Sequence, residues 1–600
     1  MILPLIPVLA PLFAAAILTA LNRVLSQRWA FYISWVAAAA AIYASAQLML
    51  DSYPDRIVYW FGNWQPRAGV ALGISFVIGP LGAGLALLAG VLVLMALVVS
   101  CRYFDTVGCF FHVLIMVFLA AMSGFSLTGD LFNLFVFFEL MSAAAFALCG
   151  YKSEEPGPLE GALNFAVVNT VGAFLVLCGI GLLYGRTGAL NMAQAGRSLG
   201  AHADGLVITS FLFIASGFFA KAAIVPFHFW LADAHTVAPT PVCILFSGVM
   251  VELGLYAVAR VYWVIFREPL SSHDAGFRGI FIALGILTAV AGSLMCYAQR
   301  NLKRLLAFST IGHMGIMLIG FALLSARALA GTAMYVAGHG LIKGALFVYA
   351  GILLNRFGSV DEFELHGRGK PMRVTGVLFA ATGLALAGLP PAGIFRGSDA
   401  IEAAARSAGY GWITAIDLLV GIFTGGAVLR VAARVFAGWG PRVEQDAAGS
   451  RQIHEERETT AQTRGALLVM TIPAFLMTAS GFVIGVIPGF EDSAGKGAAM
   501  FVAQAAYWAR VLGGQQEGAR GLAQIPSTVS VGFAAAGGAV LLAAYTIFAA
   551  RGGWESVLAA VLNRTTGGLR SLHSGVINDY VVWFTLGVAA IGAASVALLY

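Results

Sequence analysis

Apolar stretches recur along the whole chain and are separated by short polar segments. About sixteen of them are roughly 20 residues long, the length that a helix needs to cross a bilayer. They occupy residues 2–21, 30–50, 76–99, 108–128, 131–150, 161–184, 206–226, 240–266, 278–298, 304–324, 328–354, 372–400, 411–436, 465–488, 527–549 and 577–599. Only 11% of the 600 residues are charged, against about 25% in soluble proteins. The pattern predicts an all-α polytopic membrane protein with about 14–16 transmembrane helices.

Positive charge is unevenly divided between alternate connecting segments. One set of loops is richer in basic residues, among them Arg23, Arg28, Arg102, Lys152, Arg300, Lys303 and Arg304. The opposite set is poorer and includes Arg56, Arg67, Arg186, Arg197 and Arg267. Because basic loops stay in the cytoplasm, we predict a bacterial-type cell membrane protein with both termini outside. The net charge of +6 is scattered and does not form the basic stripe typical of nucleic-acid binding.

Prolines interrupt the seventh and twelfth apolar stretches. Pro226 lies at the end of the seventh, and the pair Pro390 and Pro391 lies within the twelfth. Proline removes a backbone hydrogen bond, and a broken helix at membrane depth is tolerated where it lines a polar cavity. Two broken helices five stretches apart predict an internal inverted repeat. We expect an N-terminal three-helix segment at 1–104, a first repeat at 105–266, a second repeat at 267–436, and C-terminal spans and loops at 437–600.

Ionisable residues lie deep inside several of these stretches. A charge at bilayer depth costs at least about 2.5 kcal/mol, so such a residue usually faces an ion pathway or a charged partner. His339 and Lys343 are four residues apart and therefore share one face of a helix. The candidate proton-relay residues are Glu139, Lys221, Glu252, His313, His339 and Lys343. Two alternatives stay open: a structural ion pair for Glu139, and a merely hydrogen-bonded buried ring for His313.

A proton entrance is also suggested by residue type. His228 and His235 follow the break at Pro226, and histidine titrates near neutral pH, which suits proton entry. Trp230 beside them is interpreted as an anchor at the membrane interface. Asp399 and Glu402 lie just beyond the break at the proline pair. A metal site built from these histidines is disfavoured, because their spacing fits no usual zinc or iron pattern.

Other local signals bear on structure and on cofactors. Asp130 precedes the fifth stretch and is expected to cap its first turn. Residues 498–512 fit either an interfacial amphipathic helix or a surface loop. The six cysteines form no CxxC pair, and no glycine-rich phosphate-binding motif occurs. We therefore predict no cofactor and no metal in this chain, and leave open whether its complex is an enzyme.

Six stretches together resemble a known family. They are DLFNLFVFFELMS, AKAAIVPFHFWLADAHTVAPTPV, GVMVELGLYAVARV, NLKRLLAFSTIGHMG, HGLIKGALF and LAGLPPAGIF, in this order within residues 105–435. They resemble the antiporter-like membrane subunits shared by respiratory complex I, Mrp-type multi-subunit cation/proton antiporters and membrane-bound hydrogenases. The resemblance implies a fourteen-span core of two inverted five-helix bundles, membrane-subunit partners within a hetero-oligomeric complex, and a central polar line. In that line Glu139 is the carboxylate of the fifth span, and Lys221 and Lys343 are the lysines of the seventh and eleventh.

The chain departs from that family pattern at two places. Glu252 stands where the family usually has lysine or histidine, and Asp399 follows the proline pair where the family usually has lysine. The resemblance therefore makes Asp399 and Glu402 the candidates for proton exit in place of that lysine. The predicted function is a proton-translocating membrane subunit of a multi-subunit, lipid-embedded ion-pumping complex. The alternatives are a structural membrane subunit that transports nothing and a single-chain substrate carrier. The sequence leaves open whether Na⁺ moves as well as H⁺, and whether redox chemistry or a cation gradient supplies the energy.

Overall fold

The computed structural model describes the chain in several segments. They are residues 2–104, 108–201, 203–441, 464–487, 489–513, 528–548, 567–569 and 572–599. Within them, 13 helices are long and apolar enough to cross a membrane. Three shorter apolar helices accompany these, at Gly205–Lys221, Arg373–Leu386 and Leu468–Val483. Each of the sixteen predicted stretches contains one of these helices, so the prediction of a polytopic all-α membrane protein is confirmed.

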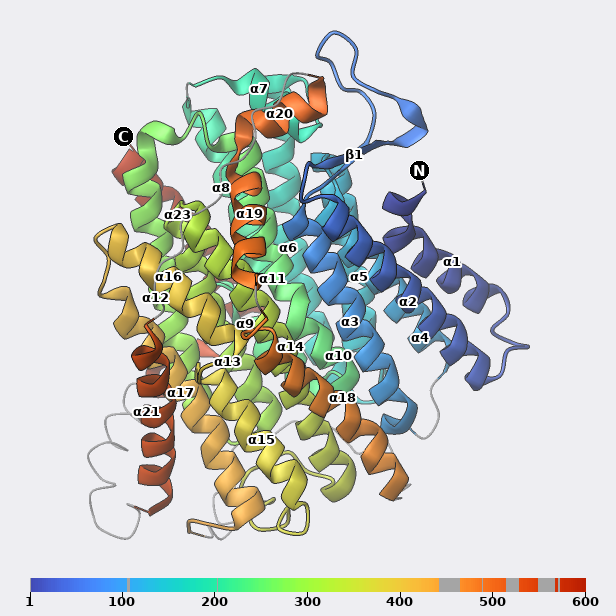
Figure 1. The fold of residues 1–600 in the computed structure, drawn as a ribbon, viewed down its shortest axis with the longest axis vertical. Helices are drawn as coiled ribbons and strands as arrows, with labels where there is room; N and C mark the ends of the chain where they lie inside the picture. The colour runs from blue at the N-terminus through green and yellow to red at the C-terminus, as the bar shows by residue number, and fades with distance from the viewer. Residues whose placement is uncertain are drawn as a thin grey trace.

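The N-terminal helices form one edge of the bundle (Figure 1). They are α1 (Ile6–Ala20), α2 (Gln27–Asp51) and α3 (Pro80–Tyr103). A two-stranded antiparallel ribbon, β1 (Ile57–Trp60) and β2 (Ser75–Ile78), connects α2 to α3. Helix α1 packs on α2 and α4, and α2 packs on α3. This edge contributes no candidate relay residue.

The next helices surround the first proline break. They are α4 (Cys109–Leu127), α5 (Leu131–Cys149), α6 (Pro156–Thr187), α7 (Met192–Leu199), α8 (Gly205–Lys221), α9 (Phe229–Val237), α10 (Thr240–Leu245) and α11 (Val251–Val261). Two π-helical turns, Phe246–Met250 and Tyr262–Phe266, make α10 and α11 parts of one long span. The carboxylate of Asp130 accepts the backbone N–H of Asn133 at 2.9 Å, so its predicted capping of α5 is confirmed.

The helices around the second break follow. They are α12 (Asp274–Tyr297), α13 (Leu302–Ala322), α14 (Ala326–Phe357), α15 (Arg373–Leu386), α16 (Gly393–Ser407) and α17 (Ile413–Ala432). Helix α14 crosses the centre of the molecule and packs on α13, α16 and α18. Gly338 allows this packing, because a Cβ atom there would lie 2.5 Å from the backbone nitrogen of Ile394 in α16. The glycines of α14 thus admit neighbouring helices.

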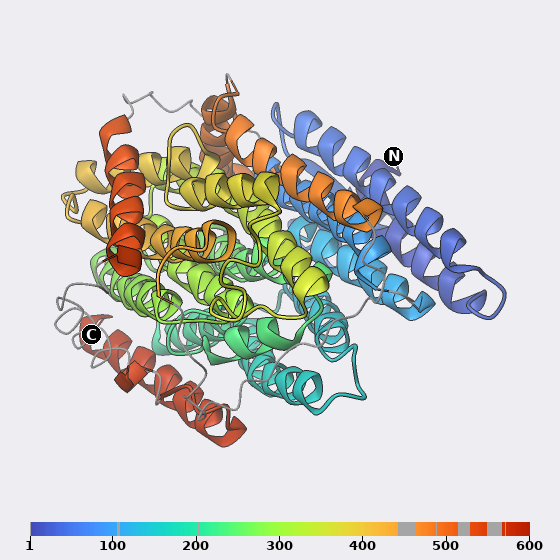
Figure 2. The same ribbon diagram turned by 90° about the horizontal axis from the view of Figure 1, so that it is seen from below.

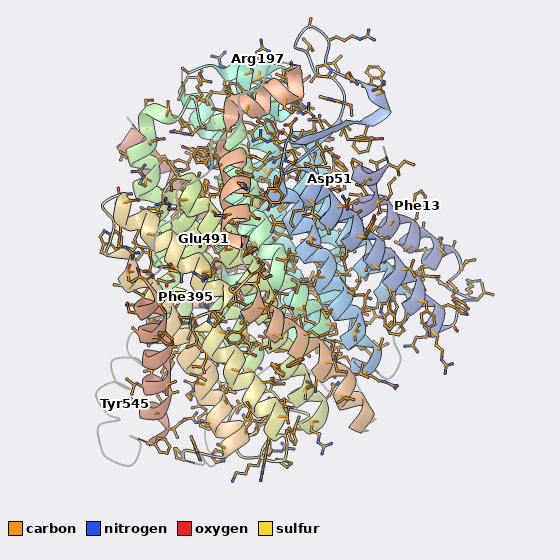
Figure 3. The ribbon with its side chains drawn as sticks, in the orientation of Figure 1. Phe13, Asp51, Arg197, Phe395, Glu491 and Tyr545 are labelled. Atoms are coloured by element: carbon orange, nitrogen blue, oxygen red, sulfur yellow. The ribbon has the colours of Figure 1, made fainter. Side chains whose placement is uncertain are left out.

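The C-terminal region differs from its prediction. Helix α18 (Arg464–Val483) is followed by α19 (Phe490–Val502) and α20 (Gln504–Leu512), and α20 lies against α7. Residues 498–512 are therefore neither one interfacial helix nor a surface loop, because Ala498, Phe501 and Tyr507 are buried. The helical structure is also interrupted between α18 and α19, and we call this interruption the third break. Figure 3 places Glu491 beside it, near the middle of the bundle.

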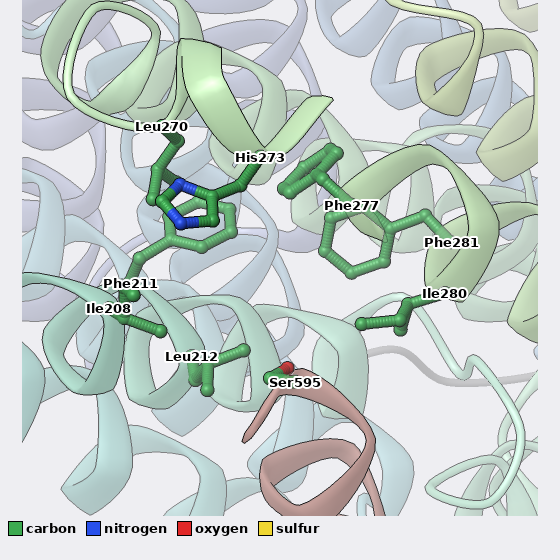
Figure 4. A pocket seen from close by; sticks show the side chains of 9 residues that line it. All are labelled: Ile208, Phe211, Leu212, Leu270, His273, Phe277, Ile280, Phe281 and Ser595. Atoms are coloured by element: carbon green, nitrogen blue, oxygen red, sulfur yellow. The ribbon is translucent and has the colours of Figure 1, made fainter. Parts of the chain in front are cut away.

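The last two described helices, α21 (Val529–Phe548) and α23 (Ile577–Leu599), lie on different sides of the bundle (Figure 2). Helix α21 packs on α15 and α17, whereas α23 packs on α6, α8 and α12. Between α8, α12 and α23 lies a cavity with an almost wholly apolar lining, to which Phe211, Phe277 and Phe281 contribute, and His273 and Ser595 lie on different sides of it (Figure 4). Such a lining offers no series of groups for ion movement.

Candidate functional site

Lys221 is the last residue of α8, where the seventh span is broken. Residues 222–228 separate α8 from α9, and the Val225–Pro226 peptide bond within them is cis. The Lys221 side chain is fully buried and its Nζ donates a hydrogen bond to Ser142 Oγ at 3.0 Å. The same nitrogen lies 5.5 Å from the ring centroid of Phe138 and 5.3 Å from that of Phe165. One hydroxyl and two aromatic faces thus hold the ammonium group.

Glu139 lies one helical turn from Ser142 on α5. Its side chain is only partly buried within the single chain. Glu139 is close enough to Lys221 for their charges to interact. These two described side chains do not form a direct ion pair. The carboxylate would therefore act on the charge of Lys221 at a distance, without accepting a hydrogen bond from its ammonium group.

The residues predicted for proton entry lie deeper than expected. His228 is 5% exposed, His235 is fully buried, and both ring nitrogens of His235 lack a partner. Trp230 is also fully buried, so its assignment as an interfacial anchor is wrong. Its ring stacks on Phe165 with 4.2 Å between centroids, and its Nε1 donates to the carbonyl of Ala220 at 2.9 Å. Trp230 therefore stiffens the break beside Lys221.

The C-terminal segment covers this entry region. The ring of His573 lies 5.0 Å from that of His228, and Tyr580 donates a hydrogen bond to Asp233 Oδ2 at 2.6 Å. Arg304 pairs with the other oxygen of Asp233 at 3.6 Å. Burial lowers the pKa of His573 to about 4. Sequence reasoning missed His573 and Tyr580, although they lie in the stretch LHSGVINDYVVW that precedes and enters the last apolar run.

Lys303 was assigned to a basic loop, and the structure corrects this assignment. The side chain is fully buried in the first turn of α13 and donates to the carbonyl of Ala238 at 2.6 Å. Lys303 and Lys343 both influence His235 electrostatically. His235 therefore lies within reach of positive charge from two sides, between the first break and α14. The motif NLKRLLAF placed Lys303 at the start of a span, but its sequence position alone could not show burial.

Lys343 lies in the middle of α14 and is fully buried. Its Nζ donates to the carbonyl of Leu306 and to Ser309 Oγ, and it lies 5.4 Å from the ring centroid of Phe347. Glu252, His313 and His339 all interact electrostatically with this lysine. The second lysine thus lies in a polar environment.

Direct contacts join Glu252 to a series of further side chains. Glu252 Oε1 lies 2.8 Å from His339 Nδ1, and the rings of His339 and His313 are 5.1 Å apart between centroids. His313 contacts the hydroxyl of Tyr335 at 2.6 Å through Nδ1 and that of Thr424 at 3.2 Å through Nε2. We name these five residues, Glu252, His339, His313, Tyr335 and Thr424, the polar network. Tyr335 and Thr424 were not predicted.

The predicted exit residues lie beyond the second break. The Pro390–Pro391 peptide bond, also cis, precedes α16, which carries Asp399 and Glu402. Glu402 accepts hydrogen bonds from Thr414 at 3.1 Å and Arg406 at 3.3 Å, and Asp399 accepts the N–H of Thr528 at 2.8 Å. Asp417 of α17, which sequence reasoning missed, is hydrogen-bonded to Glu402. The three carboxylates line one cavity.

Several buried polar atoms of this region have no hydrogen-bond partner among the described residues. They are Glu252 Oε2, His339 Nε2, both ring nitrogens of His235, His228 Nδ1 and His573 Nε2. Buried polar groups are normally hydrogen-bonded, to water where no protein group is available. The site therefore has positions at which water would bind beside titratable groups. Among the described residues, no group of three or more His, Cys, Asp or Glu is placed to hold a metal ion.

The structure brings the second half of the predicted line together more closely than the first. His339 contacts both Glu252 and His313, and Lys343 lies beside these three residues. In the described part of the chain, no polar contact joins Lys221 to Glu252. Aromatic rings lie between Lys221 and His235: Phe165, beside Lys221, is 5.6 Å from Phe246, and Phe246 is 6.0 Å from His235 between centroids. The first lysine is thus separated from His235 by two aromatic rings.

Comparisons with known proteins agree on one family. The family described as NADH:quinone oxidoreductase/Mrp antiporter, TM, matches residues 128–450. The chain is 34% identical over 399 residues to NADH-quinone oxidoreductase subunit N of Desulforudis audaxviator, covering 65% of this chain and 77% of the relative. It is 30% identical over 462 residues to a subunit of the Na⁺/H⁺ antiporter of Alkalihalophilus pseudofirmus, covering 74% and 87%.

Solved structures share the fold. A chain of the archaeal membrane-bound sulfane sulfur reductase superposes with a TM-score of 0.75 at 24% identity, covering 85% of this chain and all of that one. A chain of the Mrp complex from Dietzia sp. gives a TM-score of 0.74 at 24% identity, covering 85% and 99%. Both neighbours are chains of multi-subunit membrane complexes, and the likeness concerns the fold.

Proposed function

Because the chain belongs to the NADH:quinone oxidoreductase/Mrp antiporter family of membrane subunits, we propose that it moves protons across the cell membrane within a multi-subunit ion-pumping complex. Membership of the family and the multi-pass membrane fold support an ion-pumping subunit. The assignment of individual residues rests on the geometry of this chain.

The polar network is the observation that carries the proposal. Glu252, His339 and His313 are each no more than 2% exposed, yet Glu252 Oε2 and His339 Nε2 have no protein partner. Isolated ionisable groups at this depth are costly, and they are found where they line ion pathways or pair with one another. A scaffold needs paired charges, but it does not need a series of proton donors and acceptors with vacant hydrogen-bonding positions.

Protons enter, in this proposal, beside the first break. His573 and His228 face each other there, and Asp233 is held by Tyr580 and Arg304. His235 then lies between this entrance and Lys343. Water bound at the vacant ring nitrogens would complete the hydrogen-bonded path, because neutral imidazole both accepts and donates a proton.

Two lysines control the movement in this proposal. Lys343 carries its charge close to Glu252, His313 and His339, so loss of its proton changes how strongly all three hold theirs. Lys221 is influenced in the same way by Glu139. Protons leave from His313 through Tyr335 towards Asp417, Glu402 and Asp399. Both carboxylates of the predicted exit thus keep that role, and Asp417 joins them.

The wider proposal keeps several sequence-based assignments. The inverted repeats at 105–266 and 267–436 would each contain one broken helix, α8–α9 and α15–α16. Helix α1 begins and α23 ends towards the same end of the bundle in Figure 1, which fits termini on one side; we propose the outside. Relatives in both antiporters and NADH-quinone oxidoreductases leave either a cation gradient or redox chemistry as the energy source.

The experiment is proton flux in membrane vesicles that contain the complete complex. Lys221→Ala should abolish the acidification signal of a pH-sensitive dye, because it removes the titratable ammonium group that contacts Ser142 at the first break. Lys496→Ala, which removes an exposed lysine on α19, is the matched control and should keep normal flux. Assembly is checked by native gel electrophoresis. Normal flux in an assembled Lys221→Ala complex would contradict the proposal and favour a structural subunit.

A further inference from the structure

Two arginines are buried close together at the end of the bundle where α7 and α20 lie. Arg56 follows α2 and is 5% exposed, although the sequence assigned it to a loop, and Arg260 near the end of α11 is 4% exposed. Their guanidinium carbons lie 5.3 Å and 5.1 Å from the centroid of the same ring, that of Tyr507 on α20. A tyrosine face partly compensates two cations, but it supplies no negative charge.

The hydrogen bonds of these arginines are incomplete. Arg260 donates from Nη2 to the carbonyl of Val77 at 2.7 Å and to the hydroxyl of Tyr507 at 3.5 Å, whereas its Nε and the Nη2 of Arg56 are buried with no partner among the described residues. A guanidinium nitrogen that has been removed from water normally has an acceptor. Burial and the neighbouring Arg260 lower the pKa of Arg56 to about 10. One nitrogen of each guanidinium group therefore lacks an acceptor in the described part of the chain.

The nearby carboxylates are already engaged. Asp55 is paired with Arg510 at 2.9 Å, and Arg510 also donates to the carbonyl of Arg56. Asp130 accepts the N–H of Asn133 as the cap of α5. Neither carboxylate forms an ion pair with Arg56 or Arg260 in the described structure.

Both arginines line a cavity that also contains the start of α3. Its lining includes Gly79, Pro80, Leu81 and Gly82, together with Met500 and Phe501 of α19. Gly79 is the N-cap of α3 and supplies no capping side chain, and a Cβ atom added there would meet nothing within 4 Å. The first N–H groups of a helix and its dipole favour an anion at this position. Three independent sources of positive potential therefore converge on one cavity.

We propose that this cavity binds a phosphate group, held by Arg56, Arg260 and the N-terminus of α3. The phosphate belongs either to the headgroup of an anionic phospholipid or to free inorganic phosphate. Arginine presents a planar set of donors that fits phosphate oxygens. Apolar lining from Leu81, Met500 and Phe501 suits the glycerol and acyl end of a lipid. The proposal does not depend on proton translocation.

The test uses the full-length protein in detergent and measures its thermal unfolding temperature. The probes are dioctanoyl phosphatidylglycerol, the zwitterionic dioctanoyl phosphatidylcholine as its control, and sodium phosphate against sodium chloride at equal ionic strength. We expect phosphatidylglycerol to raise the unfolding temperature by several degrees and phosphatidylcholine to leave it unchanged. Losing one charged hydrogen-bond partner should weaken the apparent affinity for phosphatidylglycerol about tenfold or more in Arg56→Gln and in Arg260→Gln.

Matched variants separate binding from folding. Arg197→Gln removes an exposed arginine at the same end of the molecule and should keep the full lipid-dependent shift. Arg56→Lys keeps the positive charge. It should retain part of the lipid-dependent shift that Arg56→Gln loses. Each shift is measured against the same variant without ligand, so a general loss of stability does not imitate lost binding.

Each outcome decides the proposal. A shift with phosphatidylglycerol alone assigns the site to a lipid headgroup, and an equal shift with inorganic phosphate assigns it to the free anion. Both assignments require that Arg56→Gln or Arg260→Gln reduces the shift. Equal shifts in the wild type, Arg56→Gln and Arg260→Gln would overturn it, as would the absence of a shift with both anionic probes.

Discussion

The two buried lysines, Lys221 and Lys343, occupy very different surroundings. Lys221 has one hydroxyl partner, Ser142, and two aromatic rings over its ammonium group. Lys343 donates to a backbone carbonyl and a serine hydroxyl, and lies beside the polar network. Both are fully buried, so the difference lies in the number of polar partners and not in depth.

This difference indicates a division of labour within the proposed path. A lysine that lies between aromatic faces has few groups to which a proton can be passed, so its charge acts mainly through the field. A lysine beside the polar network can exchange its proton with several neighbours. The first region is therefore suited to respond to charge outside it, for example on the partly buried Glu139, and the second to conduct.

The largest expected effect is at Lys343. Lys343→Met should abolish proton flux in membrane vesicles of the assembled complex, because it removes the charge that Glu252, His313 and His339 all experience. The measurement is the dye signal of internal pH, with Lys496→Met as the control. Flux above about one tenth of the wild-type rate in an assembled complex would contradict a conducting role for the second region.

Glu252→Gln should reduce flux about tenfold, which corresponds to the loss of one charge-assisted hydrogen bond to His339. Glu252→Asp keeps the charge and shortens the side chain, and its flux should lie between that of the wild type and that of Glu252→Gln. If both variants transport at the wild-type rate, the carboxylate is structural, and the path must run through other groups.

Phe246→Ala should remove the ring that lies between Phe165, beside Lys221, and His235, and allow water between Lys221 and His235. We expect passive proton leak through the resting complex to rise several-fold, measured as the decay of an imposed pH gradient. The substitution also creates a cavity that costs about 3–5 kcal/mol of stability. Phe321→Ala, which creates a similar cavity beside Tyr262 and Phe277, is the control. Equal leak in both variants would attribute the effect to loosened packing.

The smallest expected effect concerns His573 and the pH dependence of stability. Its pKa of about 4 lies below the ordinary histidine value of 6.5, so the unfolded chain takes up a proton first as the pH falls. His573 therefore costs stability progressively from about pH 6.5 down to pH 4, of the order of 2 kcal/mol at pH 5. His573→Gln should narrow the difference in unfolding temperature between pH 7 and pH 5. An unchanged difference would show that His573 stays accessible to protons in the folded protein.

The sequence was sufficient for the spans and for the depth of most relay residues. Apolar run length located all sixteen, and the prolines located both predicted breaks. The sequence analysis ended the fourteenth stretch at residue 488 but did not predict α19, because Glu491, Asp492 and Lys496 interrupt the apolar pattern there. Apolar length measures what lipid requires, but it does not show where a helix must bend to meet its neighbours.

The candidate site was less predictable than the fold. Tyr335, Thr424 and Asp417 belong to spans whose composition is ordinary, and only packing brings them beside His313 and Glu402. Lys303 and Arg56 show the opposite case, in which the sequence indicates exposure and the structure shows burial. They are charged residues close to span ends, and positive charge there usually faces water, yet tertiary contacts bury both. Which side of a helix faces the interior depends on its neighbours, and no single span encodes it.

A hydrogen bond at the third break connects α16 to the segment between α18 and α19. Arg396 of α16 donates from Nε to the carbonyl of Gly485 at 3.0 Å, between α18 and α19. Helix α16 carries Asp399 and Glu402, and α19 leads directly into α20 with Tyr507. A shift of α16 would thus be transmitted through the segment before α19 to α20, at the end of the bundle where α7 lies.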